Sequence, residues 1–133
     1  MNDRIQQIMS KMEFNNPTNV SELEKVEKNY NIDFPDDYKK FILASNGAEG
    51  SIGNNKYLVL YPIDELIEIN NEYEVEKNQP GLIYFGSDGG DTSYAFDTTD
   101  KMSLVSIPFI CIHTEEKEKL GNNFEEFIEN LNK

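Results

Sequence analysis

Residues 23–50 read LEKVEKNYNIDFPDDYKKFILASNGAEG, and this stretch predicts two short amphipathic helices joined by a tight connection. Leu23, Val26 and Tyr30 recur at the spacing that places apolar side chains on one face of a helix. Asn31 follows them, and asparagine tolerates the left-handed conformation in which many helices end. The first helix is therefore expected to end at Asn31.

The beginnings of both helices carry signals of their own. Ser21 and Glu24 fit a capping box, in which the serine side chain accepts a hydrogen bond from an open amide and the glutamate reaches back. Pro35 is expected to open the second helix in its first turn, where its missing amide costs nothing. Asp36 and Asp37 follow it and complement the helix dipole.

The rest of this stretch and its flanks predict the remaining elements. Tyr38, Phe41 and Ile42 are expected to face inward before residues 46–47 (NG) end the helix. An earlier helix is predicted from the spacing of Ile5, Ile8, Met9 and Met12, and residues 15–17 end it. Later elements are a strand at 57–61, a helix at 64–76, strands at 82–85 and 93–96 joined by a glycine-rich turn, one or two strands at 104–112, and a closing helix carrying Phe124, Phe127, Ile128 and Leu131.

The order of these elements predicts an α+β fold. Strands that are neighbours in the sequence and joined by short turns favour a mainly antiparallel sheet, with helices packed on it and helices at both termini. No repeat, low-complexity tract or linker interrupts the 133 residues, of which 38% are hydrophobic. A chain of this length and composition supports one core, so we expect residues 1–133 to form a single domain.

The charge balance narrows the classes of partner. The chain has 25 Asp and Glu against 12 Lys and Arg, a formal net charge of −13. This charge repels nucleic-acid phosphates and anionic lipid and favours a basic protein partner. The start of the chain lacks the apolar region of a signal peptide, no apolar run approaches the ~20 residues of a membrane span, and the single cysteine allows no intrachain disulfide. We therefore expect a cytoplasmic protein.

The sequence contains no convincing constellation for catalysis or metal binding. Cys111 and His113 are the only cysteine and histidine, and they are interpreted as a core residue and a strand-end residue because no third group accompanies them. One of each is too few for a zinc site. The DGGD turn at residues 88–91 lacks the distal glutamate of an EF-hand and is better explained as a hairpin. We expect no catalytic residue, no metal and no cofactor.

A set of acids beside turn glycines is the strongest candidate for a binding surface. Acids around Tyr57, Tyr61, Tyr84 or Tyr94 would suit a basic partner, with the acids steering it and the tyrosines supplying contact area. The predicted contact residues are Glu49, Asp64, Glu65, Glu68, Asp88, Asp91, Tyr61, Tyr84 and Tyr94. The alternative stays open that the acids serve helix starts and turns and that the strand tyrosines are core residues. Replacing Asp88 and Asp91 together by lysine is expected to weaken binding without loss of stability.

Four motifs occur in order along the chain: residues 23–50 with FPDDY at 34–38, YPIDEL at 61–66, IYFGSDGG at 83–90 followed by YAFD at 94–97, and NFEEFI at 123–128. Together they resemble the SUKH superfamily, which includes bacterial immunity proteins and the fungal cell-wall-assembly regulator domain. The resemblance covers about residues 20–131. Asn31 stands where the family usually has glycine, and the chain has no tryptophan, which many members carry.

The resemblance implies a function in protein binding rather than catalysis. Its bacterial members imply a cytoplasmic antidote that binds and blocks a polymorphic or contact-delivered toxin. The C-terminal domain of such a toxin is expected to be basic and is frequently a nuclease. The fungal members imply the alternative, a regulatory or scaffolding domain with an endogenous partner. The net charge of −13 agrees with a basic target and is independent of the resemblance.

Overall fold

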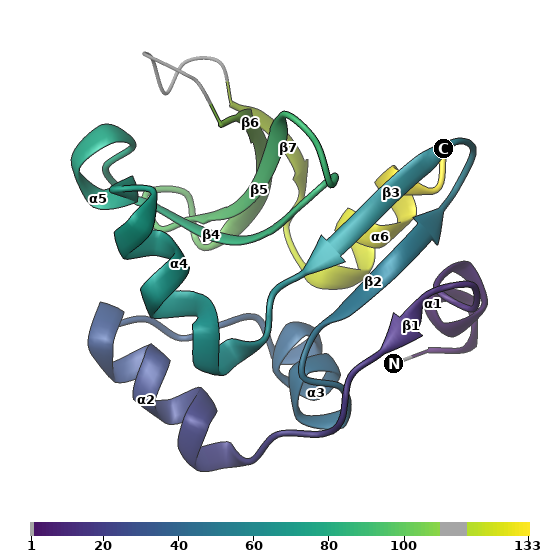
Figure 1. The fold of residues 1–133 in the computed structure, drawn as a ribbon, viewed down its shortest axis with the longest axis horizontal. Coiled ribbons are helices and arrows are strands. Elements are labelled where there is room, and N and C mark those ends of the chain that lie inside the picture. Colours follow the sequence, from purple (N-terminus) through teal and green to yellow (C-terminus); the bar gives the residue numbers. More distant parts are fainter. Residues whose placement is uncertain (1, 110–116) are drawn as a thin grey trace.

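The computed structural model describes residues 2–109 and 117–133 and arranges them as a twisted sheet with helices packed against it (Figure 1). The elements, in chain order, are α1 (Asp3–Ile8), β1 (Glu13–Phe14), α2 (Val20–Tyr30), α3 (Asp36–Ala44), β2 (Ala48–Ile52), β3 (Lys56–Leu60), the 3-10 turn η1 (Ile63–Glu65), α4 (Leu66–Glu72), α5 (Val75–Asn78), β4 (Leu82–Ser87), β5 (Thr92–Asp97), β6 (Ser103–Pro108), β7 (Glu118–Gly121) and α6 (Phe124–Leu131). The predicted α+β class, with helices at both termini, is confirmed.

The seven strands of the described residues form one antiparallel sheet, and their spatial order is the order of the chain. The junction between β3 and β4 is narrow, because only Val59 with Ser87 and Leu60 with Gly86 are paired there. Gly86 permits this approach, since a Cβ atom at that position would lie 2.4 Å from the Val59 carbonyl oxygen. The narrow junction divides the sheet into a β1–β3 half and a β4–β7 half (Figure 1).

The two predicted helices of residues 23–50 are present, with a correction at the start of the first. The cap of α2 is Asn19, whose side chain accepts a 3.0 Å hydrogen bond from the amide of Glu22, while Ser21 lies inside the helix. Asn31 adopts the expected left-handed conformation with φ of 55° and takes the place of the family's usual glycine. Pro35 precedes α3 as its cap residue rather than opening its first turn.

The first helix is shorter than its apolar spacing predicts. α1 ends at Ile8, although Met9 and Met12 are both buried. The chain turns after Met9 because the backbone of Met12 packs against Gly50, where an added Cβ atom would lie 2.7 Å from the Met12 Cα atom. This approach aligns β1 beside β2, and the sequence prediction contained neither of these two strands.

The predicted helix at residues 64–76 is broken into three pieces, η1, α4 and α5. The break lies at Glu74, which adopts a left-handed conformation with φ of 52°. As a result Val75 turns into the core, whereas Tyr73 remains 49% exposed. Continuing the helical spacing of Leu66 and Asn70 would place Tyr73 on the same side of the helix, so its exposure departs from that pattern.

Asn70 is a polar residue on the buried side of α4, and its hydrogen bonds explain its position there. Its side-chain amide donates 2.8 Å and 2.9 Å hydrogen bonds to the carbonyls of Leu66 and Tyr84 and accepts a 2.8 Å bond from the amide of Tyr84. The pairing of β3 with β4 ends before Tyr84. The side chain of Asn70 therefore bonds the Tyr84 backbone in the place that a neighbouring strand would take. It thereby fixes α4 to β4.

Apolar side chains form two clusters on opposite faces of the sheet. The main cluster fills the inner face, which α3 and α6 cover, and it includes a contact between Tyr38 and Phe96 with ring centroids 4.9 Å apart. A smaller cluster on the outer face consists of Val75, Leu82, Tyr84, Ala95, Val105 and Ile107. Both faces of the sheet are therefore stabilised by apolar contacts.

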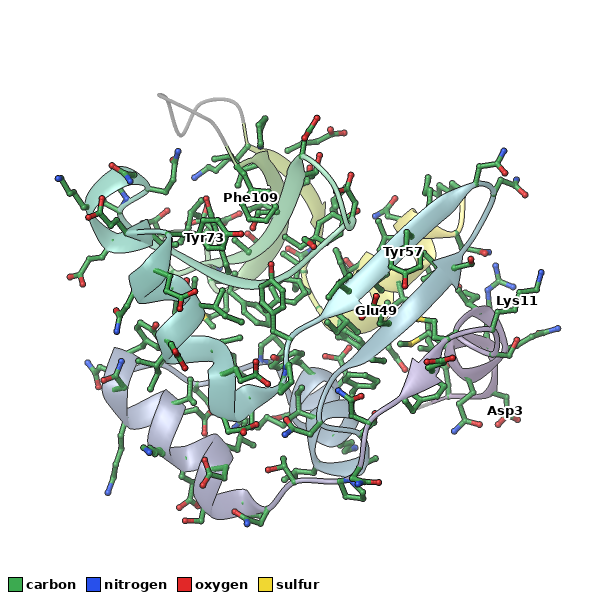
Figure 2. The ribbon with its side chains drawn as sticks, in the orientation of Figure 1. Asp3, Lys11, Glu49, Tyr57, Tyr73 and Phe109 are labelled. Carbon is green, nitrogen blue, oxygen red and sulfur yellow. The ribbon has the colours of Figure 1, made fainter. Side chains whose placement is uncertain are left out.

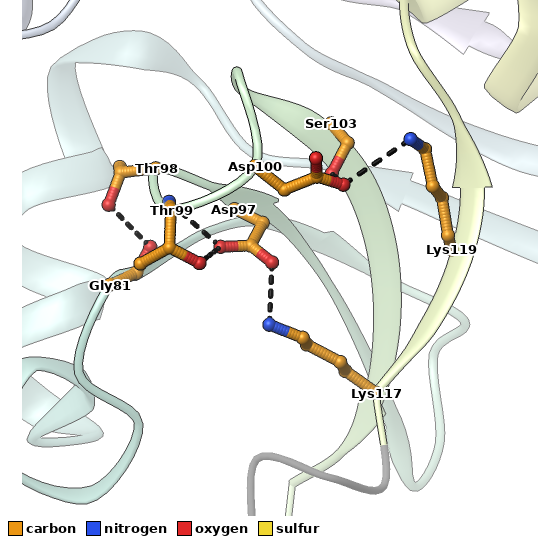
Figure 3. A network of polar contacts seen from close by, with 8 residues as sticks. All are labelled: Gly81, Asp97, Thr98, Thr99, Asp100, Ser103, Lys117 and Lys119. Carbon is orange, nitrogen blue, oxygen red and sulfur yellow. Dashed lines mark hydrogen bonds and ion pairs between the residues drawn. The ribbon is translucent and has the colours of Figure 1, made fainter.

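A polar network fastens the β5–β6 turn to β7 (Figure 3). Asp97 is a buried residue, 1% exposed. Its carboxylate accepts a 2.6 Å hydrogen bond from the Lys117 ammonium group. The amide and hydroxyl of Thr99 donate to its other carboxylate oxygen at 3.0 Å and 2.6 Å. Asp100 forms an exposed pair with Lys119 at 3.3 Å. These contacts add to the backbone pairing of β7 with β6, since the sequence of β7 contains no apolar alternation.

Candidate partner-binding surface

The outer face of the β1–β3 half is solvent-exposed and carries acids and a tyrosine. In β3 Leu58 is buried in the main cluster, while Tyr57 and Val59 alternate with it and lie on the opposite face. In β2 Ala48 is buried on the inner face, so its neighbour Glu49 also lies on the outer face. Figure 2 shows Glu49 and Tyr57 over the β2–β3 hairpin.

The strand register connects this exposed half to the second apolar cluster. Val59 lies opposite Ser87, and Ser87 lies opposite Ser93. Residues paired across a sheet share a face, as do residues two apart in one strand. Tyr57, two residues before Val59, therefore shares the outer face with Ala95, two residues after Ser93.

Glu49 and Tyr57 are joined by a hydrogen bond on this face. The Tyr57 hydroxyl donates to the Glu49 carboxylate at 2.6 Å. This bond, together with slight burial and the charges of Glu49 and Glu13, raises the pKa of Tyr57 above its ordinary value. Glu13 lies directly opposite Glu49 in the β1–β2 pairing. Like charges placed opposite each other in a sheet repel, so this pair would gain from an external cation.

The β4–β5 turn lies between Tyr57 and the aromatic residues of the other half. Gly89 has φ of 80°, and a Cβ atom there would lie 3.0 Å from the Tyr57 ring. Asp91 is exposed, and its carbonyl accepts a 2.9 Å hydrogen bond from the amide of Phe109. Asp88 has a structural role, because its carboxylate accepts bonds of 2.8 Å and 3.2 Å from the amides of Gly90 and Thr92.

Three aromatic rings form the far end of the outer face. Tyr73 and Phe109 stack with ring centroids 4.9 Å apart and an interplanar angle of 30°. The ring of Tyr84 meets the edge of Phe109 at 5.7 Å and lies beneath the pair. Figure 2 shows Tyr73 and Phe109 beside one another, apart from Glu49 and Tyr57. We call the set Glu13, Glu49, Tyr57, Asp91, Tyr73 and Phe109 the outer strip.

The predicted contact tyrosines differ in exposure. Tyr61 is half-buried and touches both apolar clusters, and burial raises its pKa while a hydrogen bond with Ser87 offsets part of this effect. Tyr84 and Tyr94 are 3% and 7% exposed. Tyr94 packs against Phe127 in the main cluster, and burial followed by the charge of Asp88 raises the pKa of Tyr94 to about 12. Tyr84 and Tyr94 are therefore core residues, which was the alternative interpretation of the sequence.

The predicted contact acids fall into two groups. Glu49 and Asp91 belong to the outer strip, with Asp88 inside the adjacent turn. Asp64, Glu65 and Glu68 are exposed on η1 and α4, and Asp64 accepts a 2.8 Å hydrogen bond from the Asn46 side chain. Within residues 2–109 and 117–133, no hydrogen bond or ion pair joins the second group to the first.

No cationic side chain of the described residues pairs with an acid of either group. The ion pairs of the described residues use Arg4, Lys39, Lys117 and Lys119, and none of them includes a predicted contact acid. The ammonium group of Lys56, the residue before Tyr57, donates hydrogen bonds of 3.1 Å and 2.9 Å to the carbonyls of Leu131 and Lys133. Residues 57–76 contain six acids and no Lys or Arg. The outer face and α4 are therefore sources of uncompensated negative charge.

Other kinds of site have little support in the part of the chain that the structure describes. No group of three His, Cys, Asp or Glu side chains there could hold a metal ion. Cys111 and His113 lie outside the described residues. A groove of about 460 Å³ lies between α2, α4–α5 and β4, and Asn29, Tyr30 and Glu76 contribute to its lining. Burial and then the charge of Glu76 raise the pKa of Tyr30, which disfavours the tyrosinate a base or nucleophile would need.

The fold defines an α+β domain, and the sequence comparison identifies its family. The chain belongs to the SMI1 / KNR4 family (SUKH-1), which it matches over residues 17–130. No curated protein matches the chain. Among the described residues, no helix has the length and apolar character needed to cross a membrane.

Sequence reasoning missed four members of the outer strip as contact residues, Glu13, Tyr57, Tyr73 and Phe109. Tyr57 was considered among the tyrosines near acids but was not included in the predicted contact residues. Glu13 was assigned to the end of a helix. No sequence signal was available for Tyr73, because the left-handed conformation of Glu74, which ends the helix beside it, is seen only in the structure.

Proposed function

We propose that this protein is a cytoplasmic immunity protein, which binds a cognate polymorphic or contact-delivered toxin and blocks it by occlusion. The observation that carries the proposal is the outer face, which combines exposed Tyr57 and Tyr73 with acids that form no ion pair among the described residues. Membership in SUKH-1 supports it, because bacterial members of this superfamily are expected to be antidotes. The proposal requires no catalysis by this chain.

The net charge of −13 suits a toxin with a basic substrate cleft, such as a nuclease. Negative charge on the antidote accelerates the encounter with a basic surface, and this acceleration falls as salt screens the charges. Exposed tyrosines then supply contact area that survives at higher salt. The bound antidote would cover the surface on which the phosphates of a nucleic acid would otherwise lie.

The experiment is a co-purification of this protein with the C-terminal toxin domain encoded beside its gene, combined with a growth assay. We expect a stoichiometric complex, and we expect cells that produce the toxin domain to grow only when this protein is also produced. A toxin domain that neither binds this protein nor loses its toxicity would contradict the proposal. Stoichiometric capture of a housekeeping protein would instead support a regulatory or scaffolding domain.

A further inference from the structure

The outer strip allows the chemistry of the partner's contact residues to be inferred. We propose that the outer strip is the docking face for a basic protein surface that presents arginine side chains, with a guanidinium group held between the Glu13–Glu49 pair and the Tyr57 ring. This inference rests on the proposed function for the identity of the partner, but its chemistry comes from the face itself.

Exposure of aromatic side chains is the first argument. The described residues contain four exposed large hydrophobic side chains, and two of them, Tyr57 at 40% and Tyr73 at 49%, lie on the outer face. Tyr73 is stacked on Phe109, and Tyr57 is bonded to Glu49, so both rings are held in place before a partner arrives. Ordered aromatic side chains lose little conformational entropy on binding.

The arrangement of charge is the second argument, and it selects a cation. Glu13 and Glu49 face each other across β1 and β2, and neither forms an ion pair among the described residues. Asp91, whose backbone carbonyl bonds the amide of Phe109, adds a third exposed carboxylate. A cation at the pair would relieve the repulsion between the two carboxylates, a gain that an uncharged partner could not provide.

The combination of rings and carboxylates favours arginine over lysine. A guanidinium group is planar, donates several hydrogen bonds in one plane and stacks on an aromatic ring, whereas an ammonium group is compact and strongly hydrated. Tyr57 offers a ring face next to the Glu49 carboxylate, which its own hydroxyl already contacts at 2.6 Å. Arginine can use the ring and the carboxylate at the same time.

The acids of η1 and α4 are a less suitable face. Glu65 and Glu68 are exposed and unpaired among the described residues, but Asp64 is engaged by Asn46. Acids in the first turn of a helix also complement its dipole without any partner. These residues therefore provide a control with the same charge at a different place.

The test titrates the isotope-labelled protein with octa-arginine and octa-lysine peptides and follows its backbone NMR signals. We expect the signals of Glu49, Tyr57 and Gly89 to shift most and octa-arginine to bind more tightly than octa-lysine. Glu13→Gln with Glu49→Gln is expected to weaken octa-arginine binding roughly fivefold, the effect of two exposed ion pairs. Glu65→Gln with Glu68→Gln removes the same charge and is expected to change the affinity less than about twofold.

Tyr57→Ala with Tyr73→Ala tests the aromatic part. This variant is expected to lose the preference for arginine while its octa-lysine affinity stays the same. Equal weakening by the two glutamine variants, shifts centred on α4, or equal binding of both peptides would overturn the inference. Because no toxin is present, these results are independent of the growth assay, which alone decides the proposed function.

Discussion

The carboxylate of Asp37 accepts a 3.1 Å hydrogen bond from the backbone amide of Phe124, 87 residues further along the chain. Its second oxygen accepts a 2.9 Å bond from the amide of Glu125. A residue in the first turn of α3 therefore caps the first turn of α6, whose own cap, Asn123, accepts from the amide of Glu126. This contact gives a physical reason for the second aspartate in the FPDDY motif.

Asp37→Ala is expected to lower the free energy of unfolding by about 1 to 2 kcal/mol, because two amides at the start of α6 lose their acceptor. Urea denaturation at neutral pH measures the change. Asp36→Ala is the matched control, since Asp36 is exposed in the same turn and forms no hydrogen bond with α6 among the described residues. Equal losses in the two variants would show that the effect comes from the dipole of α3 instead.

Asn70→Ala is expected to destabilise the protein by about 3 kcal/mol. The substitution removes the side-chain partners of the Tyr84 amide and carbonyl inside the protein, and water cannot easily replace them at a residue 5% exposed. Thermal and urea denaturation measure the loss. Asn71→Ala, at the exposed neighbouring position, should change stability by less than about 0.5 kcal/mol, and a similar loss in both variants would contradict the bridging role.

Asp97 is expected to make stability depend on pH in the acid range. Burial would raise the pKa of its carboxyl group, but hydrogen bonds from Lys117 and Thr99 outweigh burial and hold the pKa below its ordinary value. A carboxyl group whose pKa is lower in the folded state stabilises the protein fully above its unfolded pKa of about 4. This contribution disappears as the pH falls through the lowered folded value.

Asp97→Asn should therefore be less stable at pH 7, by about 2 kcal/mol, because the new amide group faces the Lys117 ammonium group. It should also lose less stability than the unaltered protein when the pH falls below about 4. Urea denaturation over a pH series measures both effects. Asp100→Asn, whose carboxylate is half exposed, is the control and should change the stability at pH 7 much less than Asp97→Asn does.

The two aspartates of the β4–β5 turn are expected to respond differently to replacement by lysine. Asp91→Lys should weaken binding of the partner and leave the melting temperature unchanged, because its side chain is exposed and its structural contact uses the backbone carbonyl. Asp88→Lys should also lower stability by about 1 kcal/mol, since it removes the acceptor for two turn amides. Affinity and melting temperature, measured on both single variants, separate the two effects. Unchanged affinity in Asp91→Lys would exclude the turn from the interface.

Local signals in the sequence sufficed to predict most of the helices and the central hairpin. The stripe of Phe124, Phe127, Ile128 and Leu131 and the left-handed Asn31 are determined by neighbouring residues, so they could be predicted without the rest of the fold. The cap of α2 could not be fixed in this way. Asn19 and Ser21 are both good capping residues, and only the packing of the helix decides between them.

The elements that the sequence did not predict depend on distant residues. In β2 only Ala48 and Ile52 are buried, and in β7 only Gly121 is, so neither strand shows apolar alternation. Their backbones are paired by β3 and β6. The outer strip was predicted only in part for the same reason, because the register of β1 to β4 and the break at Glu74 decide which side chains share its face.

The meander order of the strands leaves the sheet with two edges, β1 and β7, and both are poor templates for strand addition. β1 is two residues long and carries Glu13, and β7 carries Glu118 and Lys119. Short, charged edge strands discourage pairing with another chain. The amides of β7 are accordingly expected to keep their hydrogen-exchange rates when a partner binds. Recognition then depends on side chains and not on backbone pairing, so surface substitutions can change the specificity of this protein without altering its fold.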